Sequence, residues 1–294
     1  MIREKSDPCF QIINGLIFGL FALICIYPFY YILINSISAT DLADKGQIML
    51  YPKGIHFTNY TEVMKKESVR NGALISVLRT IAGTAAQVFG ASYMAYFFTK
   101  RKMWFRKALY RFVVITMYFG AGMIPVYLNI KALGLLNSFW VYVIPGMFPV
   151  YNMILIKTFM ESIPASLEES AEIDGAGYFR RYLRIVMPLS LPIIATVALW
   201  GMVGQWNSYM DTLLYVTNQK LHTLQYVLYQ LLNQADLVAK QALKGGNIGQ
   251  MVNQLTPTAF RMTVTVVVTL PIMLVYPFMQ KYFVGGIMIG AVKG

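Results

Sequence analysis

The sequence EESAEIDGAGYFRRYLRIVMPLSLP, residues 168–192, lies between two long apolar segments. It begins with carboxylates, is interrupted by Gly175, continues with arginines and ends with Pro188 and Pro192. Charged side chains at this density are too costly for the hydrocarbon core of a bilayer. The pattern therefore predicts a helix–glycine–helix element outside the membrane, in a chain whose neighbouring segments cross it.

The first helix of this element is expected to begin near a serine and to end at a glycine. Ser162 or Ser166 can cap it, because serine oxygens accept hydrogen bonds from the free amides of a first turn. Asp174-Gly175 should end it, because glycine adopts backbone angles that other residues resist. Ala171 and Gly175 make the helix narrow. A narrow acidic helix fits a groove on another protein, although a helix lying in the membrane interface has a similar pattern.

The composition of the whole chain agrees with a membrane protein. Of the 294 residues, 57% are hydrophobic and 13% are charged, whereas about a quarter of the residues of a soluble domain are charged. Six segments are apolar and near the roughly 20 residues that span a bilayer as a helix. We therefore predict an all-α, multi-pass membrane protein. The predicted spans are 12–37, 73–98, 112–130, 138–156, 189–210 and 262–280.

The segment KRKMWFRKALYR, residues 100–111, sets the predicted orientation. It contains six basic residues and no acidic residue, and such short basic connections face the cytoplasm. The net charge of +12 would also suit nucleic acid, but the clustering beside a span favours anionic lipid headgroups. Residues 1–11, the loop 157–188 and the C-terminus are then cytoplasmic, while loops 38–72, 131–137 and 217–261 lie outside.

Two of the outer loops are long enough to carry structure of their own. We expect a short helix near residues 59–66. Residues 225–241 have apolar positions at helical spacing, so we expect a helix there, followed by a GGN turn and a polar return. The loop 217–261 is suited either to meeting an extracytoplasmic partner or to packing as a lid on its own spans.

Glycines and prolines interrupt several predicted spans. Proline removes a backbone donor and kinks a helix, and membrane helices tolerate this where neighbours or a cavity accommodate the freed groups. Gly120 and Gly122, followed by Pro125, allow either close helix packing or a bend in a transport path.

The segment IPASLEESAEIDGAGYFRRYLRIVMPLSLP, residues 163–192, resembles the EAA signature of the permeases of ABC importers. Two positions depart from that pattern, since Ser170 replaces an alanine and Met187 replaces a leucine. The resemblance covers the whole chain in span order and includes WNSYMDTLLYVT, residues 206–217, which is similar to a stretch of the sugar-importing branch. The positions in register with the signature are Glu169, Ser170, Ala171, Asp174, Gly175, Ile185, Met187 and Pro188.

The resemblance implies a type I ABC importer permease fold and a transport function, similar to the maltose and alginate importer permeases. It implies that a helix around Glu169–Gly175 docks on a cytoplasmic ATPase, and the residues that it assigns to this coupling are Glu168, Glu169, Ala171, Asp174 and Gly175. The chain has no GxxxxGK[ST] phosphate loop, so ATP and magnesium belong on a separate dimeric ATPase. The other implied partners are a second permease, a solute-binding protein and an oligosaccharide substrate. The resemblance is strongest to permeases that import complex or acidic oligosaccharides.

Polar and aromatic residues suggest where a sugar passes. Amides are unfavourable against lipid and should face the bundle interior or water. Trp206 can stack on a sugar ring or belong to the aromatic belt of the membrane interface, and Asp211 comes late enough to be solvated outside. The candidates for the path, besides Arg79, are Tyr118, Gln205, Trp206, Asn207, Tyr209 and Asp211.

Arg79 is the one charged residue within a predicted span. A charge in a span points to function, and an arginine that lines the path would favour acidic sugars. An arginine two turns from a helix end can instead extend its head group to the interface.

Two other classes of function remain to be weighed. An ion-coupled secondary transporter or channel would need paired ionisable groups in the membrane or inverted repeats. An intramembrane enzyme would need a catalytic constellation at membrane depth, and no histidine lies in a predicted span. We expect no catalytic residue, bound cofactor or metal, since His56 and His222 lie in different outer loops.

Overall fold

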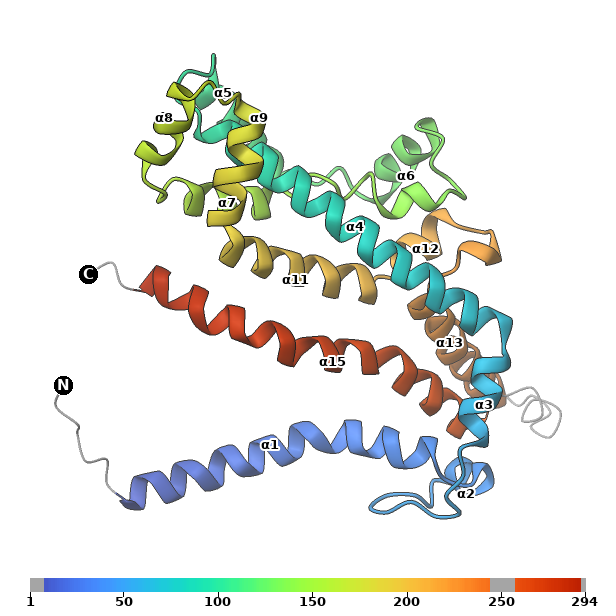
Figure 1. Cartoon of the computed structure of the whole chain (residues 1–294). Coiled ribbons are helices and arrows are strands. Elements are labelled where there is room, and N and C mark those ends of the chain that lie inside the picture. The colour runs from blue at the N-terminus through green and yellow to red at the C-terminus, as the bar shows by residue number, and fades with distance from the viewer. Residues whose placement is uncertain (1–7, 244–256, 292–294) are drawn as a thin grey trace. The chain divides into compact units, whose positions relative to one another are not determined.

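The computed structural model describes residues 8–243 and 257–291, and the regular elements in these ranges are helices (Figure 1). The GGN turn expected after residue 241 lies outside the described residues. The long helices are α1 (Pro8–Ser36), α4 (Glu67–Thr99), α11 (Leu191–Asn207), α13 (Leu224–Leu243) and α15 (Thr258–Ala291). The others are α2 (Thr40–Asp44), α3 (Thr58–Lys65), α5 (Arg106–Thr116), α6 (Met123–Ala132), η1 (Phe139–Tyr142), α7 (Val150–Met160), α8 (Ala165–Ile173), α9 (Tyr178–Arg181), η2 (Tyr182–Val186), α10 (Met187–Leu189), α12 (Met210–Tyr215) and η3 (Gln219–Leu221).

Three of the described helices are long and apolar enough to cross a membrane. They lie in α1, α4 and the first part of α15, in agreement with the predicted spans 12–37, 73–98 and 262–280. The helical run Tyr178–Leu189 meets α11 at an angle of 85° and forms with it a further candidate span. The bend follows Pro188 and precedes Pro192, at the start of the predicted span 189–210, and was not expected from the sequence.

The predicted spans 112–130 and 138–156 are not single helices, and this expectation was wrong. α5 ends at Thr116, and the chain resumes as α6 after Gly122, whose φ is +83°. In the second segment a regular α-helix begins only after Pro149. The physical reason is the set of glycines and prolines, which remove backbone donors or favour non-helical angles. Gly120 and Gly122 lie in the break between α5 and α6, and an added Cβ at either would meet no atom of the described residues within 4 Å.

The chain forms two compact units. The first contains residues up to Lys66 and residues 230–270, and its buried core includes Ile34, Ile48 and Ala259. α3 confirms the helix expected near residues 59–66, and Asn59 from α3 donates a hydrogen bond to the Ser36 carbonyl. The short helix α2 was not expected from the sequence.

The second unit contains residues 67–229 and 271–294, and α4 is the helix around which it is built. α11 and α7 pack along α4 (Figure 1). Gly83 on α4 faces the Gln205 side chain of α11, and Gly201 on α11 faces Gln87 of α4. A side chain at either glycine would collide with these amides, so the glycines permit the close approach that small residues provide in membrane bundles.

The two ends of α4 carry different loops of the second unit. Residues 100–111 and α8 lie at its carboxyl end, where Lys100 pairs with Glu168. At the other end, Asn71 donates to the Lys220 carbonyl. The loops that the sequence assigned to one side thus share one end of α4, while the assignment of that end to the cytoplasm stays a prediction.

Candidate functional site

A cavity of about 490 Å³, lined by both apolar and polar side chains, lies within the second unit. Its walls include charged or amide side chains from α4, α7, α11 and α12. These are Arg79, Gln87, Asn152, Gln205 and Asp211. The sequence predicted Arg79, Gln205 and Asp211 as path residues, and the structure brings these three together although they are distant in the chain.

Arg79 is 2% exposed and forms a two-pronged ion pair with Asp211. Its Nη2 lies 2.5 Å from Asp211 Oδ2, and its Nη1 lies 3.1 Å from Asp211 Oδ1. Nη1 also donates to the Ser208 carbonyl at 3.1 Å. The extension of Arg79 to the membrane interface and the solvation of Asp211 outside are therefore both wrong, because each group is the partner of the other.

Gln205 and Tyr142 complete the surroundings of Arg79. Gln205 Oε1 accepts hydrogen bonds from Arg79 Nε at 3.2 Å and Nη2 at 2.9 Å. The guanidinium also lies over the Tyr142 ring, 4.5 Å from its centroid, an arrangement that stabilises a desolvated cation. Every nitrogen of the guanidinium thus has a partner, and Asp211 balances its charge.

The remaining path candidates lie elsewhere. Tyr118 is 75% exposed, Asn207 is exposed, and Tyr209 stacks on Tyr229 at 4.5 Å. Trp206 is half-buried and is not among the residues that line this cavity. Their role in transport stays a prediction.

Sequence reasoning missed several lining residues. Gln87 and Asn152 are amides within predicted spans, so the argument that singled out Gln205 would have found them. Trp200 was not missed, because it is one of the aromatic residues that the predicted span 189–210 offers to a sugar. It lines the cavity and stacks with Tyr151, with ring centroids 6.3 Å apart. Tyr142 carries no comparable signal, because a tyrosine in an apolar segment is most often a packing residue.

The cavity offers neutral hydrogen-bonding groups and an aromatic ring. Amides both donate and accept hydrogen bonds, which suits a ligand rich in hydroxyl groups. Within residues 8–243 and 257–291, no three His, Cys, Asp or Glu side chains gather where they could hold a metal ion. The arrangement fits recognition of a polar solute.

The second candidate site is α8, which carries the acidic residues of the opening segment. Its N-cap is Pro164, and no side chain caps it, so the serine cap was wrong. Ser162 instead donates to the Phe159 carbonyl. The expected end is confirmed, because α8 stops at Ile173, and Gly175 follows with a φ of +78°.

The residues predicted to couple to an ATPase lie on α8 or directly after it, and they differ in how accessible their side chains are. Glu169, Asp174 and Gly175 are exposed, and Ala171 is half-buried. Glu168 is different, because it pairs with Lys100 and accepts a hydrogen bond from Tyr96 Oη at 3.0 Å. A partner protein can therefore reach Glu169, whereas the Glu168 carboxylate is already engaged.

A second ion pair holds the other end of α8. Glu172 accepts hydrogen bonds from Arg181 at 2.7 Å and from Lys102 at 3.2 Å. The hydrogen bond from Arg181, followed by that from Lys102, lowers the pKa of Glu172 below its ordinary value. Since a lowered carboxyl pKa keeps the group ionised, this ion pair is lost only as the pH falls below the usual range of a glutamate.

Gly175 and Gly177 form a matched pair for testing the turn after α8. Gly175→Ala is expected to destabilise this turn by about 1–2 kcal/mol, because an L-residue resists positive φ. Gly177→Ala should have little effect, since its φ is −67° and an added Cβ would meet nothing within 4 Å. Thermal unfolding of the two purified variants compares them, and equal stability would show that the turn tolerates a side chain.

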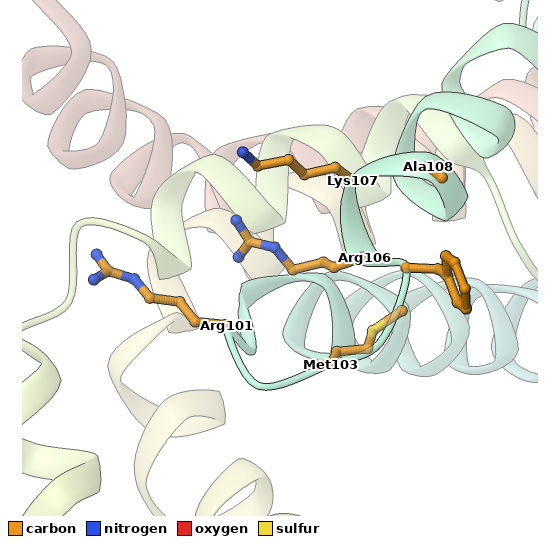
Figure 2. A pocket seen from close by; sticks show the side chains of 6 residues that line it. Arg101, Met103, Arg106, Lys107 and Ala108 are labelled. Carbon is orange, nitrogen blue, oxygen red and sulfur yellow. The ribbon is translucent and has the colours of Figure 1, made fainter.

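Basic side chains surround a pocket of about 560 Å³ beside α5 (Figure 2). Arg101, Arg106 and Lys107 line it, and the adjacent Trp104 is 85% exposed. Arg106 also donates to the Phe98 and Thr99 carbonyls at the end of α4. Four basic residues of the segment 100–111 are thus exposed, whereas Lys100 is engaged by Glu168. The exposed ones are Arg101, Lys102, Lys107 and Arg111, and their contact with lipid headgroups stays a prediction.

Comparison with known families gives a match over most of the chain. Residues 87–288 match the family described as "Binding-protein-dependent transport system inner membrane component". This range contains the α8 element and the whole cavity except for Arg79.

Two relatives from Bacillus subtilis (strain 168) align over nearly their full length. The polygalacturonan/rhamnogalacturonan transport system permease protein YtcP is 36% identical, over 97% of this chain and 99% of the relative. Protein LplC is 37% identical, over 100% of this chain and 98% of the relative.

A solved structure has a similar fold. One chain of a bacterial ABC transporter involved in the import of the acidic polysaccharide alginate matches with a TM-score of 0.83 and 30% identity. The match covers 96% of this chain and 99% of the other.

Proposed function

The chain belongs to the binding-protein-dependent transport system inner membrane components, and we propose that it passes an oligosaccharide through the cavity beside Arg79. As a permease, it is a transport subunit with a type I permease fold. The observation that carries the proposal is the cavity itself, about 490 Å³ in volume and lined by amides, Trp200 and a neutralised ion pair. Such a surface matches hydroxyl groups and a sugar ring.

The proposed substrate is a complex or acidic oligosaccharide. Two similar proteins have names or titles that refer to polygalacturonan and rhamnogalacturonan or to alginate, and their alignments cover almost the whole chain. Because Asp211 neutralises Arg79, the cavity holds no free cation among the charged residues that line it. A sugar carboxylate would have to compete with Asp211 for the guanidinium, so amides and not charge would carry most of the binding.

The proposed energy source is a separate dimeric ATPase that binds ATP and magnesium and docks on α8. The exposed Glu169 and the turn at Gly175 give that partner an accessible acidic helix end. A second, related permease completes the membrane path, and an extracytoplasmic solute-binding protein delivers the sugar. In this arrangement, residues 100–111 and 157–188 face the cytoplasm, as do both termini.

Reconstitution tests the proposed function directly. The chain is co-expressed with its partner permease and ATPase, and the complex is placed in liposomes with the solute-binding protein. We expect accumulation of an oligogalacturonate that requires both ATP and the solute-binding protein. ATP-independent uptake driven by an ion gradient would instead support a secondary transporter. The family assignment does not favour that function, nor does the neutral Arg79–Asp211 ion pair in the cavity.

A further inference from the structure

The helix α8 is attached to the rest of its unit by ion pairs. None of its residues is buried, so apolar packing contributes little to its position. A cavity of about 480 Å³ opens between α8 and the end of α4, with Glu168, Glu169 and Glu172 among its lining residues. Ion pairs and hydrogen bonds across this cavity therefore determine how closely α8 and the neighbouring helices move together.

Glu168 provides the attachment to α4. Its Oε2 accepts a hydrogen bond from Tyr96 Oη at 3.0 Å and pairs with Lys100. Both side chains of the ion pair are mostly buried, and the Lys100 ammonium lies over the Tyr96 ring, 3.8 Å from its centroid. Burial lowers the pKa of Lys100, and Glu168 opposes this shift by favouring the charged form. A partly desolvated pair with a third donor is more rigid than an exposed ion pair.

The helix α4 connects this attachment to the cavity. It runs without a proline from Glu67 to Thr99. Arg79 lies 17 residues before Tyr96 on the same helix, which corresponds to about 26 Å along the axis. A displacement of the carboxyl end of α4 would therefore reach the Arg79–Asp211 ion pair through one continuous helix.

Glu172 provides a separate attachment, to α9. Arg181 donates the hydrogen bond to Glu172. Its side chain is 5% exposed, and its guanidinium lies over the Tyr178 ring, 4.5 Å from the ring centroid. The run that begins with α9 leads through the 85° bend into α11, which carries Gln205. The two attachments of α8 thus lead to α4 and α11, the two helices whose side chains meet at Arg79.

We propose that Glu168 is a positioning residue, which transmits movement of α8 to α4 and so to the Arg79–Asp211 pair. The two neighbouring glutamates then have different functions. Glu169 binds the partner ATPase, and Glu168 holds α8 to α4. This inference rests on the proposed function. It predicts that, without the Glu168 ion pair, the complex keeps its ATPase and hydrolyses ATP but transports less sugar for each ATP.

The test compares Glu168→Gln with the charge exchange Glu168→Lys/Lys100→Glu in the reconstituted complex. Glu168→Gln is expected to lower sugar uptake about tenfold, a coupling loss of ordinary size, while ATP hydrolysis continues. The ATP consumed per sugar should therefore rise. The exchanged pair should restore part of the uptake, because it rebuilds the ion pair. The rise in ATP consumed per sugar distinguishes lost coupling from a merely structural defect, which would lower hydrolysis and uptake together. Glu161→Gln, at an exposed i,i+4 ion pair outside α8, is the matched control.

A second measurement follows the movement itself. Spin labels at Ser166 on α8 and Phe97 on α4, both exposed in the chain, report the distance between the helices in a background without Cys9 and Cys25. The distance should stay constant on ATP binding when Glu168 is present and change when glutamine replaces it.

Three results would overturn the inference. They are an unchanged ATP-to-sugar ratio in Glu168→Gln, an equal label distance in both proteins, and loss of the ATPase from the purified Glu168→Gln complex. The last would make Glu168 a docking residue. Failure of the unmodified complex to transport sugar would instead refute the proposed function, so the two failures are distinguishable.

Discussion

Asp211→Asn is expected to destabilise the chain by about 3 kcal/mol, at the lower end of the cost of breaking a buried ion pair. The substitution leaves the Arg79 guanidinium, which is 2% exposed, without a counter-charge. The remaining acceptors, Gln205 Oε1 and the Ser208 carbonyl, carry no net charge. Sugar uptake should fall strongly as well, because the cavity wall would rearrange around the unpaired cation. Denaturation of the purified complex and uptake into liposomes measure the two effects.

The double variant Arg79→Leu/Asp211→Leu separates stability from transport. Removing both partners leaves no buried charge, so much of the lost stability should return. Uptake should remain low, because two leucines make this part of the cavity wall apolar and leave Gln205 Oε1 without its Arg79 donors. Glu62→Gln, at an exposed surface pair with Lys65, should change neither property. If Asp211→Asn is as stable as the double variant, the ion pair is not required for the stability of the fold.

Glu169→Lys is expected to reduce coupled sugar uptake by more than about tenfold, the effect of reversing a charge in an interface that relies on it. The fold should be retained, because Glu169 is exposed and has no ion-pair or hydrogen-bond partner in the described part of the chain. Co-purification of the ATPase with the permease measures the loss of docking.

Glu161→Lys is the matched control for this charge reversal. Glu161 follows α7, four residues before α8 begins, and forms an exposed pair with Lys157. The same change of charge there should leave ATPase binding almost unaltered. Equal loss in both variants would mean that general electrostatics, and not the position on α8, determines docking.

The local features of α8 were predictable from the sequence. Hydropathy and backbone sterics act over a few residues, so the acidic helix and its end before Gly175 follow from the residues themselves. The long helices α1, α4 and α15 are predictable for the same reason. Two predicted spans are not single helices, because a hydropathy average counts glycine and proline as compatible with a helix, whereas the backbone breaks there.

The candidate site was predictable only in part. Arg79 and Gln205 were identifiable as polar side chains in apolar segments, because lipid cannot satisfy them. Their arrangement was not, since Arg79 and Asp211 are 132 residues apart in the chain. An acidic residue near a span end has the same local sequence whether water or an arginine is its partner.

The sequence by itself determined the membrane class of the chain, the family resemblance and the existence of α8, because each depends on residue types and short spacings. Only the tertiary structure decided which charges neutralise one another. Glu168 and Glu169 are adjacent and chemically identical, yet one faces Lys100 and Tyr96 while the other is exposed. The position of α8 beside the end of α4 creates this difference, since the energy of a charge depends on the groups that folding places around it.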